Sequence, residues 1–372
     1  MSENAEESIR KANKLAAEHG IDLSKLPKNL DMSPENITEN VHAMNSNCPD
    51  ERMKFVFKSL VTHLHDFVRE TSITTEEWMY VFLSCGHSDI HRRGYRHIGP
   101  HSNSSLRPAK CVRRLVKASK PISTFPILNL ILFLQSRIYP PLGFAWRLEP
   151  CRFAEPREAP LVLQKPPSLD LFSPLTLWIV IENGESIASE GKGDYLWVEG
   201  KVKDTKGNPI PNCIINTWET DGHGMYDNQY AERGGPDCRG RLHTREDGSF
   251  FFRAIVPVSY PIPSDGPVGK MVTALGRHVF RPAHLHMMLE APGFEKLVTA
   301  FYFKGDPYLT SDAVFGVKSS LIVDTTTETD VEVTRKRGFK EATSHKVLKH
   351  DFVLATPEEG AEARKRIMPN TV

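Results

Sequence analysis

The second half of the chain contains a succession of short segments typical of β-strands, and in the first of them apolar residues Leu196, Val198 and Val202 alternate with polar ones. These segments lie at 196–202, 214–218, 249–256, 284–289, 297–303 and 349–354. Runs rich in glycine, proline and aspartate separate them, such as DTKGN at 204–208. Alternation places one face of a strand in a core and the other in solvent, so the pattern restricts the fold to a mainly β class. We predict an antiparallel β-sandwich over residues 181–355.

The first part of the chain has a helical pattern. Apolar residues recur at helical spacing at Val56, Leu60, Leu64 and Phe67. The run TTEE at 74–77 has the form of a capping box, which starts a further helix. We therefore predict a small helical unit at 33–85, and the polar residues before it predict a mobile leader at 1–32.

Residues 86–180 differ in composition from the segments on either side. They are rich in proline, arginine, serine and histidine, and they show neither the helical period of 3.6 nor the strand period of 2. The run at 139–167 contains enough proline to prevent long helices and central strands. We interpret 86–180 as anomalous and poorly ordered, and our hypothesis is an unspliced intron or frame-shifted stretch.

The C-terminal residues 356–372 are predicted to be a polar tail with some helical character.

The charge balance excludes several kinds of partner. The chain has 47 basic and 46 acidic residues and a formal net charge of +1, which indicates neither nucleic acid nor an anionic membrane as a partner.

The longest apolar run, FPILNLILFL at 125–134, is too short to span a bilayer. Residues 1–20 lack the apolar region of a signal peptide, and the six cysteines form no CxxC pair. We therefore expect a cytoplasmic protein with reduced thiols.

The sharpest local motif is a pair of histidines separated by one residue, in the run RPAHLH. On a strand, His284 and His286 lie on the same face, where they can give two nitrogen ligands to one metal. Ordinary hydrogen-bonding roles explain so short a motif as well. A zinc hydrolase is a further alternative, but it needs a third His, Asp or Glu ligand. Glu290 is on the same face, four residues beyond His286, which is too far for easy ligation.

Two tyrosines follow predicted strands. Tyr226 comes after Gly224 and Met225, and Tyr260 comes after the run IVPVS. Each is also compatible with an ordinary packing role. A tyrosine hydroxyl has an unperturbed pKa of about 10, so it becomes a ligand only beside a strongly acidic metal. Iron(III) is such a metal, whereas zinc and calcium usually take other donors.

Residues 195–324 resemble the catalytic domain of the intradiol ring-cleavage dioxygenases, particularly the catechol and hydroxyquinol 1,2-dioxygenases. Five motifs support the resemblance, and they occur in the order that the family has. They are VEGKVKDTKGNPIPNCIINTWETDGHGMY at 198–226, RGRLHTREDGSFFF at 239–252, IVPVSY at 255–260, GRHVFRPAHLHMM at 276–288 and GDPYLTSDAVFGV at 305–317. Each motif is moderately specific, and the ordered set is much more specific than any one of them.

The resemblance implies a non-haem iron(III) cofactor, with Tyr226, Tyr260, His284 and His286 as ligands. It implies that Arg281 lies over the substrate ring and that Tyr260 leaves the iron and takes up a substrate proton, which makes these two the catalytic residues. A salt bridge at the rim of the site is the alternative role for Arg281. The implied reaction is cleavage of catechol by O2 to give cis,cis-muconate. Hydroxyquinol, which gives maleylacetate, is the alternative substrate.

The sequence also departs from the family pattern. Asn216 stands where the family usually carries Asp, and Ala300 stands where bacterial relatives often carry Gln. The family's linker and one wall of its substrate pocket have no counterpart in 86–180. If that segment is genuine, the alternative to an active dioxygenase is an inactive β-sandwich binding module. The helical unit at 33–85 is similar to the family's dimerisation region, which implies a homodimer through the N-terminal helices.

Overall fold

The computed structural model describes most of the chain outside its first 30 residues and a long central stretch. The described residues are 22–25, 31–73, 178–230, 235–340 and 344–367, together with positions 10, 14, 17, 28 and 77. Most of the predicted leader at 1–32, most of the capping box at 74–77 and nearly all of the anomalous segment at 86–180 therefore lie outside them. The described residues are mostly strands with a few helices, which confirms the mainly β class.

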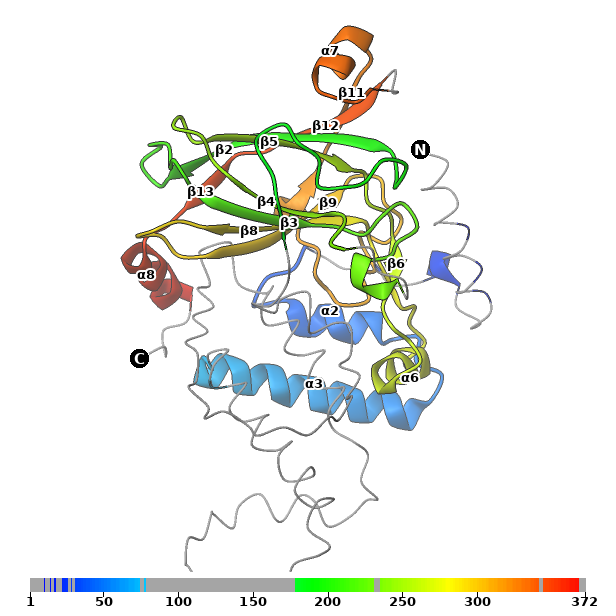
Figure 1. The fold of residues 1–372 in the computed structure, drawn as a ribbon. Helices are drawn as coiled ribbons and strands as arrows, with labels where there is room; N and C mark the ends of the chain where they lie inside the picture. Colours follow the sequence, from blue (N-terminus) through cyan, green and yellow to red (C-terminus); the bar gives the residue numbers. More distant parts are fainter. Residues whose placement is uncertain are drawn as a thin grey trace, which may run out of the picture.

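The strands form two layers (Figure 1). In spatial order, the first sheet contains β1 (Ile179–Val180), β4 (Arg239–His243), β3 (Ile214–Trp218), β8 (His284–Glu290), β9 (Leu297–Phe303) and β10 (Ile322–Val323). The second contains β11 (Thr326–Glu328), β12 (His345–Lys349), β2 (Tyr195–Asp204) and β13 (Phe352–Leu354), with β5 (Ser249–Ile255) paired to β2. A separate short pair joins β6 (Tyr260–Pro261) to β7 (Phe280–Arg281).

Both main sheets are mixed, whereas the succession of short strands separated by turns predicted antiparallel pairing. Strand β1 runs parallel to β4, β10 to β9, and both β12 and β13 to β2, while the pairs β2–β5, β3–β4, β3–β8 and β8–β9 are antiparallel. The predicted strand at 349–354 is divided, because β12 ends at Lys349 and β13 begins at Phe352. Alternation within one strand shows which face is buried, but it carries no information on the direction of its neighbours.

The main hydrophobic core lies between the two sheets. Its side chains come from β2 and β5 on one side and from β3, β4, β8 and β9 on the other. Leu285, Met287 and Leu289 point from β8 into this core. Because successive side chains of a strand point in opposite directions, His284 and His286 stand on the outer face of the same sheet.

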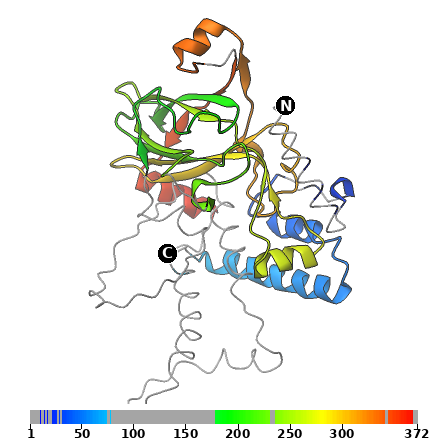
Figure 2. The same ribbon diagram turned by 45° about the vertical axis from the view of Figure 1, so that its right-hand side comes forward.

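Helices lie on that outer side, where α2 (Ile37–Met44), α3 (Glu51–Thr71) and α6 (Pro267–Ala274) are grouped in both views (Figure 1, Figure 2). Asp50 starts α3 by accepting a 2.9 Å hydrogen bond from the Met53 N–H. Ser72 ends the helix in the left-handed conformation, with φ of 49°.

Helix α3 confirms the helix predicted from the period of its apolar residues, but that apolar face is not the buried one. Val56 and Phe67 are 40% and 42% exposed, whereas His65 and Val68 are buried. The Nδ1 of His65 lies 2.9 Å from the Thr38 hydroxyl near the start of α2. A helical period identifies an apolar face, but it does not show which face a neighbouring helix covers.

The helical unit packs directly on the β-rich part. Phe315 lies in one buried cluster with Met32, Ile37, Val41 and Met44. The Cys48 thiol also donates to the Ala274 carbonyl at the end of α6, at 3.5 Å. These contacts join segments that are far apart in the sequence and place the loop at 311–316 between the helices and the first sheet.

The remaining helices are short or peripheral. They are η1 (Leu23–Lys25), η4 (Asp227–Gln229), η5 (Ser319–Leu321), α7 (Val331–Lys336) and α8 (Pro357–Ile367). Helix α8 corresponds to most of the tail predicted at 356–372, and Arg364 attaches it to Glu295 through hydrogen bonds of 2.8 and 2.6 Å. Within the part of the chain that is described, no helix combines the length and the hydropathy of a membrane span.

Candidate metal centre

The register of the first sheet assembles one row of aromatic and imidazole side chains. His286 lies directly opposite Trp218 on β3 and Ala300 on β9, and His284 lies opposite Tyr302. The two imidazole rings lie 4.6 Å apart between centroids, at 82° to each other. The prediction that His284 and His286 share a face is therefore confirmed.

Tyr226 reaches these histidines from the loop after β3. Asp221 orders this loop, because its Oδ1 accepts hydrogen bonds from the N–H groups of His223 and Met225 at 2.9 and 3.1 Å. Gly224 has φ of 75°, and a Cβ at this position would lie 3.0 Å from the Cβ of Tyr260. The loop can therefore approach the Tyr260 segment only with glycine at 224.

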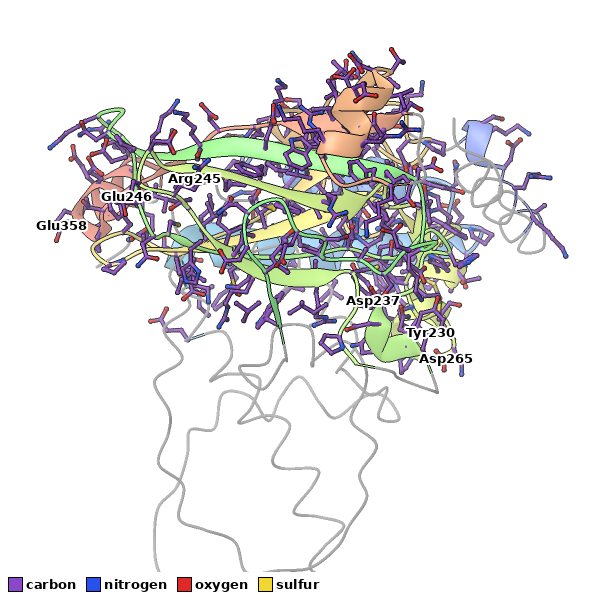
Figure 3. The ribbon with its side chains drawn as sticks, turned by 45° about the horizontal axis from the view of Figure 1, so that its top comes forward. Tyr230, Asp237, Arg245, Glu246, Asp265 and Glu358 are labelled. Carbon is purple, nitrogen blue, oxygen red and sulfur yellow. The ribbon has the colours of Figure 1, made fainter. Side chains whose placement is uncertain are left out.

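Polar contacts hold the outer side of the same loop. The Tyr230 hydroxyl donates to Asp221, and Lys192 Nζ lies 3.9 Å from Asp221 and 3.8 Å from Asp237. Asp227, next to Tyr226, forms a buried ion pair with Arg239. Figure 3 shows Tyr230 and Asp237 close together at one end of the strand layers, with Arg245, Glu246 and Glu358 at the opposite end.

Tyr260 is placed by the β6–β7 pair, in which it lies opposite Arg281. Asp306 fixes both sides of this pair, since its Oδ2 accepts from the Ser259 hydroxyl at 2.6 Å and from the Ala283 N–H at 2.8 Å. Burial raises the pKa of the Asp306 carboxyl, although these hydrogen bonds act in the opposite direction.

The four predicted ligand side chains converge in a buried site. The hydroxyls of Tyr226 and Tyr260 lie 3.0 Å apart, and the Tyr260 hydroxyl lies 3.4 Å from the Nε2 of His284. His284 and His286 are 2% and 3% exposed. Trp218 stacks on His286 at 4.6 Å and 13°, and Trp178 packs edge-on against Trp218. The indole of Trp218 therefore fixes the plane of the His286 ring.

The tautomer of His284 follows from its hydrogen bonds. Its Nδ1 lies 2.8 Å from the Pro282 carbonyl oxygen, which can only accept, so Nδ1 carries the proton. Nε2 is then the atom with the lone pair, and it faces Tyr260 and Arg281. A backbone carbonyl that orients an imidazole in this way is the usual second partner of a metal-binding histidine.

Arg281 lies within this site and not at its rim. The residue is 3% exposed, and its Nη1 lies 3.0 Å from His284 Nε2 and 3.4 Å from the Tyr260 hydroxyl. It also pairs with Asp312 through Nε at 3.3 Å. Burial by itself would lower the Arg281 pKa, but Asp312 and the neighbouring tyrosine hydroxyls raise it well above its usual value. Arg281 does form a salt bridge, but the pair is buried, so the alternative of a salt bridge at the rim of the site is wrong about where the pair lies.

The donor set fits iron(III) better than zinc. Two phenol oxygens and two imidazoles meet, and a buried guanidinium lies beside the Tyr260 phenol. No group of three or more His, Cys, Asp or Glu is placed to hold a metal among the residues that the structure describes. Glu290, considered for a zinc site, instead pairs with Lys296 at 3.0 Å. The residues present therefore match a ferric ion with tyrosinate ligands.

The structure shows the surroundings of Asn216 and Ala300, the two residues that depart from the family pattern. Asn216 accepts a 2.7 Å hydrogen bond from Arg241 Nε through its side-chain oxygen, a bond that an aspartate oxygen could also accept. Ala300 is fully buried opposite His286, and two residues later Tyr302 brings a hydroxyl to the same face.

Several supporting residues were not identified from the sequence. They are Trp218, Asp221, Tyr302, Asp306 and Asp312; Asp306 is half-buried and the other four are buried. Trp218, Tyr302, Asp306 and Asp312 act through contacts between separate segments, so no local spacing pattern marks them, whereas Asp221 orders its own loop. Aspartates in turn-forming runs such as SDAVFG are a weak signal, because such residues are common in ordinary loops.

Comparison with known proteins places the chain in a family. Residues 181–356 match the family described as Dioxygenase, and residues 50–83 match the one described as catechol dioxygenase N terminus. The chain is 40% identical over 344 residues to the intradiol ring-cleavage dioxygenase hqdA of Aspergillus niger, and the match covers 92% of this chain and 91% of that protein. The chain belongs to the intradiol ring-cleavage dioxygenases.

Other relatives of this dioxygenase differ in their named substrates. It is 36% identical over 300 residues to the 6-chlorohydroxyquinol 1,2-dioxygenase of Cupriavidus pinatubonensis, covering 79% of this chain and 92% of that protein. It is 30% identical over 319 residues to the catechol 1,2-dioxygenase of Candida albicans, covering 84% and 89% respectively. The family predicted from the ordered motifs is thus confirmed.

Proposed function

We propose that this dioxygenase uses iron(III) to cleave a 1,2-dihydroxybenzene with O2 between its two hydroxylated carbons. The proposed ligands are Tyr226, Tyr260, His284 and His286. The observation that carries the proposal is their convergence: two phenol hydroxyls 3.0 Å apart and an imidazole nitrogen 3.4 Å from one of them, in a buried site. Bound ferric iron would hold the deprotonated substrate and draw electron density from its ring, which prepares the ring for reaction with O2.

Tyr260 and Arg281 are the proposed catalytic residues. Tyr260 lies between the Tyr226 hydroxyl and His284 Nε2, so its phenolate oxygen is placed to take up a proton from a substrate hydroxyl. Arg281 presents Nη1 to the same oxygen at 3.4 Å. Its buried positive charge stabilises an anionic substrate and the negative charge that develops on it, and burial strengthens this effect.

His284 and His286 act by holding a fixed geometry. The Pro282 carbonyl keeps the His284 proton on Nδ1, and the Trp218 indole keeps the His286 ring in its plane. Both supports come from residues that do not touch the reacting atoms. They limit reorganisation of the ligands when substrate enters the site.

For the substrate, we place hydroxyquinol ahead of catechol. The resemblance put catechol first and hydroxyquinol as the alternative, but relatives named for hydroxyquinol substrates are 36% and 34% identical to this chain, against 30% for the catechol relative. Hydroxyquinol would give maleylacetate, and catechol would give cis,cis-muconate. The catechol relative, similar over 84% of this chain, keeps catechol as the second candidate.

An assembly and a location are also proposed. A homodimer through the N-terminal helices is supported by the exposed apolar side chains of Phe55 and Phe67 on α3. A cytoplasmic location is supported by the buried, unbridged thiols of Cys48, Cys213 and Cys238.

Iron loading followed by oxygen uptake tests the proposed function. The full chain, loaded anaerobically and then oxidised, should absorb visible light through charge transfer from tyrosinate to iron. Hydroxyquinol and catechol should each be offered, with O2 consumption and the ring-opened dicarboxylate measured together. A chain that binds iron without a visible band would contradict the tyrosine ligands. A chain with the band but without turnover of either diol would instead support the inactive binding module.

A further inference from the structure

Tyr302 is a third tyrosine at the proposed metal centre. It is fully buried on β9, directly opposite His284, and its ring centroid lies 5.5 Å from that imidazole. Its hydroxyl accepts a 3.1 Å hydrogen bond from Nη2 of Arg281. The proposed ligand set does not use this hydroxyl, although it lies on the same face of the sheet as the two histidines.

Asp312 holds another part of the same guanidinium. Its Oδ1 accepts from Arg281 Nε at 3.3 Å. The carboxylate is itself fixed by the loop, because it accepts the N–H groups of Val314 at 3.2 Å and Gly316 at 2.8 Å. The guanidinium therefore has partners on two separate elements, the loop at 311–316 and strand β9.

The loop reaches this position because residue 316 has no side chain. A Cβ on Gly316 would lie 2.6 Å from the Tyr302 hydroxyl, 3.0 Å from Arg281 Nη2 and 3.0 Å from Asp312 Oδ2. Real Cβ atoms do not approach other atoms as closely as 2.6 Å, so any larger residue would push these three groups apart. The contact between Tyr302 and Arg281 is therefore tightly enclosed.

A planar guanidinium that is held at two nitrogens has its third nitrogen fixed as well. Asp312 takes Nε and Tyr302 takes Nη2, so Nη1 is left to face the metal centre. There it lies 3.0 Å from His284 Nε2 and 3.4 Å from the Tyr260 hydroxyl. Removing the Tyr302 hydroxyl would take away the contact at Nη2 and leave the orientation of the guanidinium less constrained.

We propose that Tyr302 is a positioning residue of the reaction, whose hydroxyl fixes the Arg281 guanidinium so that Nη1 faces Tyr260 and His284. The inference rests on the proposed function, because it assigns Arg281 to the anionic substrate. It concerns the hydroxyl and not the ring, which packs in a buried cluster with Ala300 and Val317. Tyr302 acts through Arg281 and does not itself touch the reacting atoms.

Tyr302→Phe tests this directly, because it removes the hydroxyl and keeps the ring. A matched control is Tyr308→Phe. Tyr308 is equally buried, but its hydroxyl has no hydrogen-bond partner among the described residues. Both variants should bind iron and keep the visible tyrosinate band. Tyr302→Phe should lose about tenfold in kcat/KM, mostly in kcat, as expected for the loss of one hydrogen bond to a charged group. Equal activity of the two variants would overturn the proposal.

A double-mutant cycle with Arg281→Lys separates positioning from a general structural effect. Lysine keeps the charge but has no planar fork for Tyr302 to orient. In the Arg281→Lys background, Tyr302→Phe should change kcat/KM by less than about twofold, because the two changes remove one shared interaction. The same tenfold loss in both backgrounds would show that Tyr302 acts independently of Arg281, and the proposal would fail.

A readout that needs neither iron nor turnover keeps the two proposals distinguishable. In the wild-type apoprotein, a guanidinium held at Nε by Asp312 and at Nη2 by Tyr302 should give separate 15N signals for Nη1 and Nη2 of Arg281. Tyr302→Phe should merge them by restoring rotation, while Tyr308→Phe should not. Unchanged Arg281 signals in Tyr302→Phe would contradict the positioning role even if the enzyme is active. An inactive wild type with the expected signals would contradict the proposed function alone.

Discussion

The hydroxyls of Tyr226 and Tyr260 lie 3.0 Å apart, although the two residues are separated by 34 positions and follow different strands. Each phenol would pack without strain elsewhere, and two hydroxyls in a dry interior gain at most one mutual hydrogen bond. Their meeting beside His284 and Arg281 is the arrangement expected of a cation site that binds phenolates.

Tyr226→Phe should remove the visible band and lower turnover by at least about a hundredfold, since a lost ligand affects both charge transfer and the electronics of the metal. The band and oxygen uptake should be measured on the same preparation. Tyr230→Phe is a suitable control, because Tyr230 bonds Asp221 at the outer side of the loop. Turnover that survives in Tyr226→Phe would show that the ligand assignment is wrong.

Gly224→Ala should weaken both the fold and the metal centre. The substitution forces a side chain into φ of 75° and into contact with Tyr260, so we expect a loss of about 2–3 kcal/mol in unfolding free energy together with poorer iron retention. Gly207→Ala is the matched control, because Gly207 has φ of 87° but a Cβ added there would meet no atom within 4 Å. It should cost only about 1 kcal/mol and leave iron binding intact. Similar iron loss in both variants would contradict the role of the Gly224–Tyr260 contact.

His278 should make the apoprotein less stable in acid. Its Nδ1 accepts the Phe280 N–H, so Nε2 carries the proton and donates to the Ser311 hydroxyl. Burial, with the nearby Arg277 charge, lowers the pKa of His278 to about 4. A histidine that is harder to protonate in the folded state contributes stability above its unfolded pKa of about 6.5, and loses it as pH falls to 4.

For His278 this difference is worth up to about 3 kcal/mol. Urea unfolding of wild type and His278→Gln between pH 4 and 7 measures it. The gap in unfolding free energy between the two proteins should widen as pH rises through this window. A gap that does not change with pH would show that His278 titrates alike in both states.

Glu219 should have the opposite effect. Burial raises its carboxyl pKa well above the usual value, and its Oε1 accepts the Ile255 N–H at 3.0 Å. A raised pKa means that folding takes up a proton above the unfolded pKa, so this residue lowers stability as pH rises. Glu219→Gln keeps the acceptor and removes the ionisable group, and should therefore become more stable than wild type as pH increases above about 4.5. Equal pH profiles in urea unfolding would contradict this.

Much of the fold was predictable, because burial in a strand leaves a local signature. The segments predicted as strands at 297–303 and 214–218 are β9 and β3, with their predicted bounds. The histidine pair was assigned to one face of a strand for the same reason, and that prediction is confirmed. Parallel pairing between β2 and its neighbours β12 and β13 was not predictable, since the direction of a partner strand is a property of the whole chain path.

By itself, the sequence determined the family, the mainly β class and the identity of the four candidate ligands, because ordered motifs and period-2 alternation are local properties of a chain. Only the tertiary structure decided how these residues are supported. Asp306 joins the segments of Tyr260 and His284, and Tyr302 and Asp312 orient Arg281. These contacts depend on three-dimensional proximity between distant segments, and a hydrogen bond leaves no periodic trace in the sequence when its partners lie 20 or more positions apart.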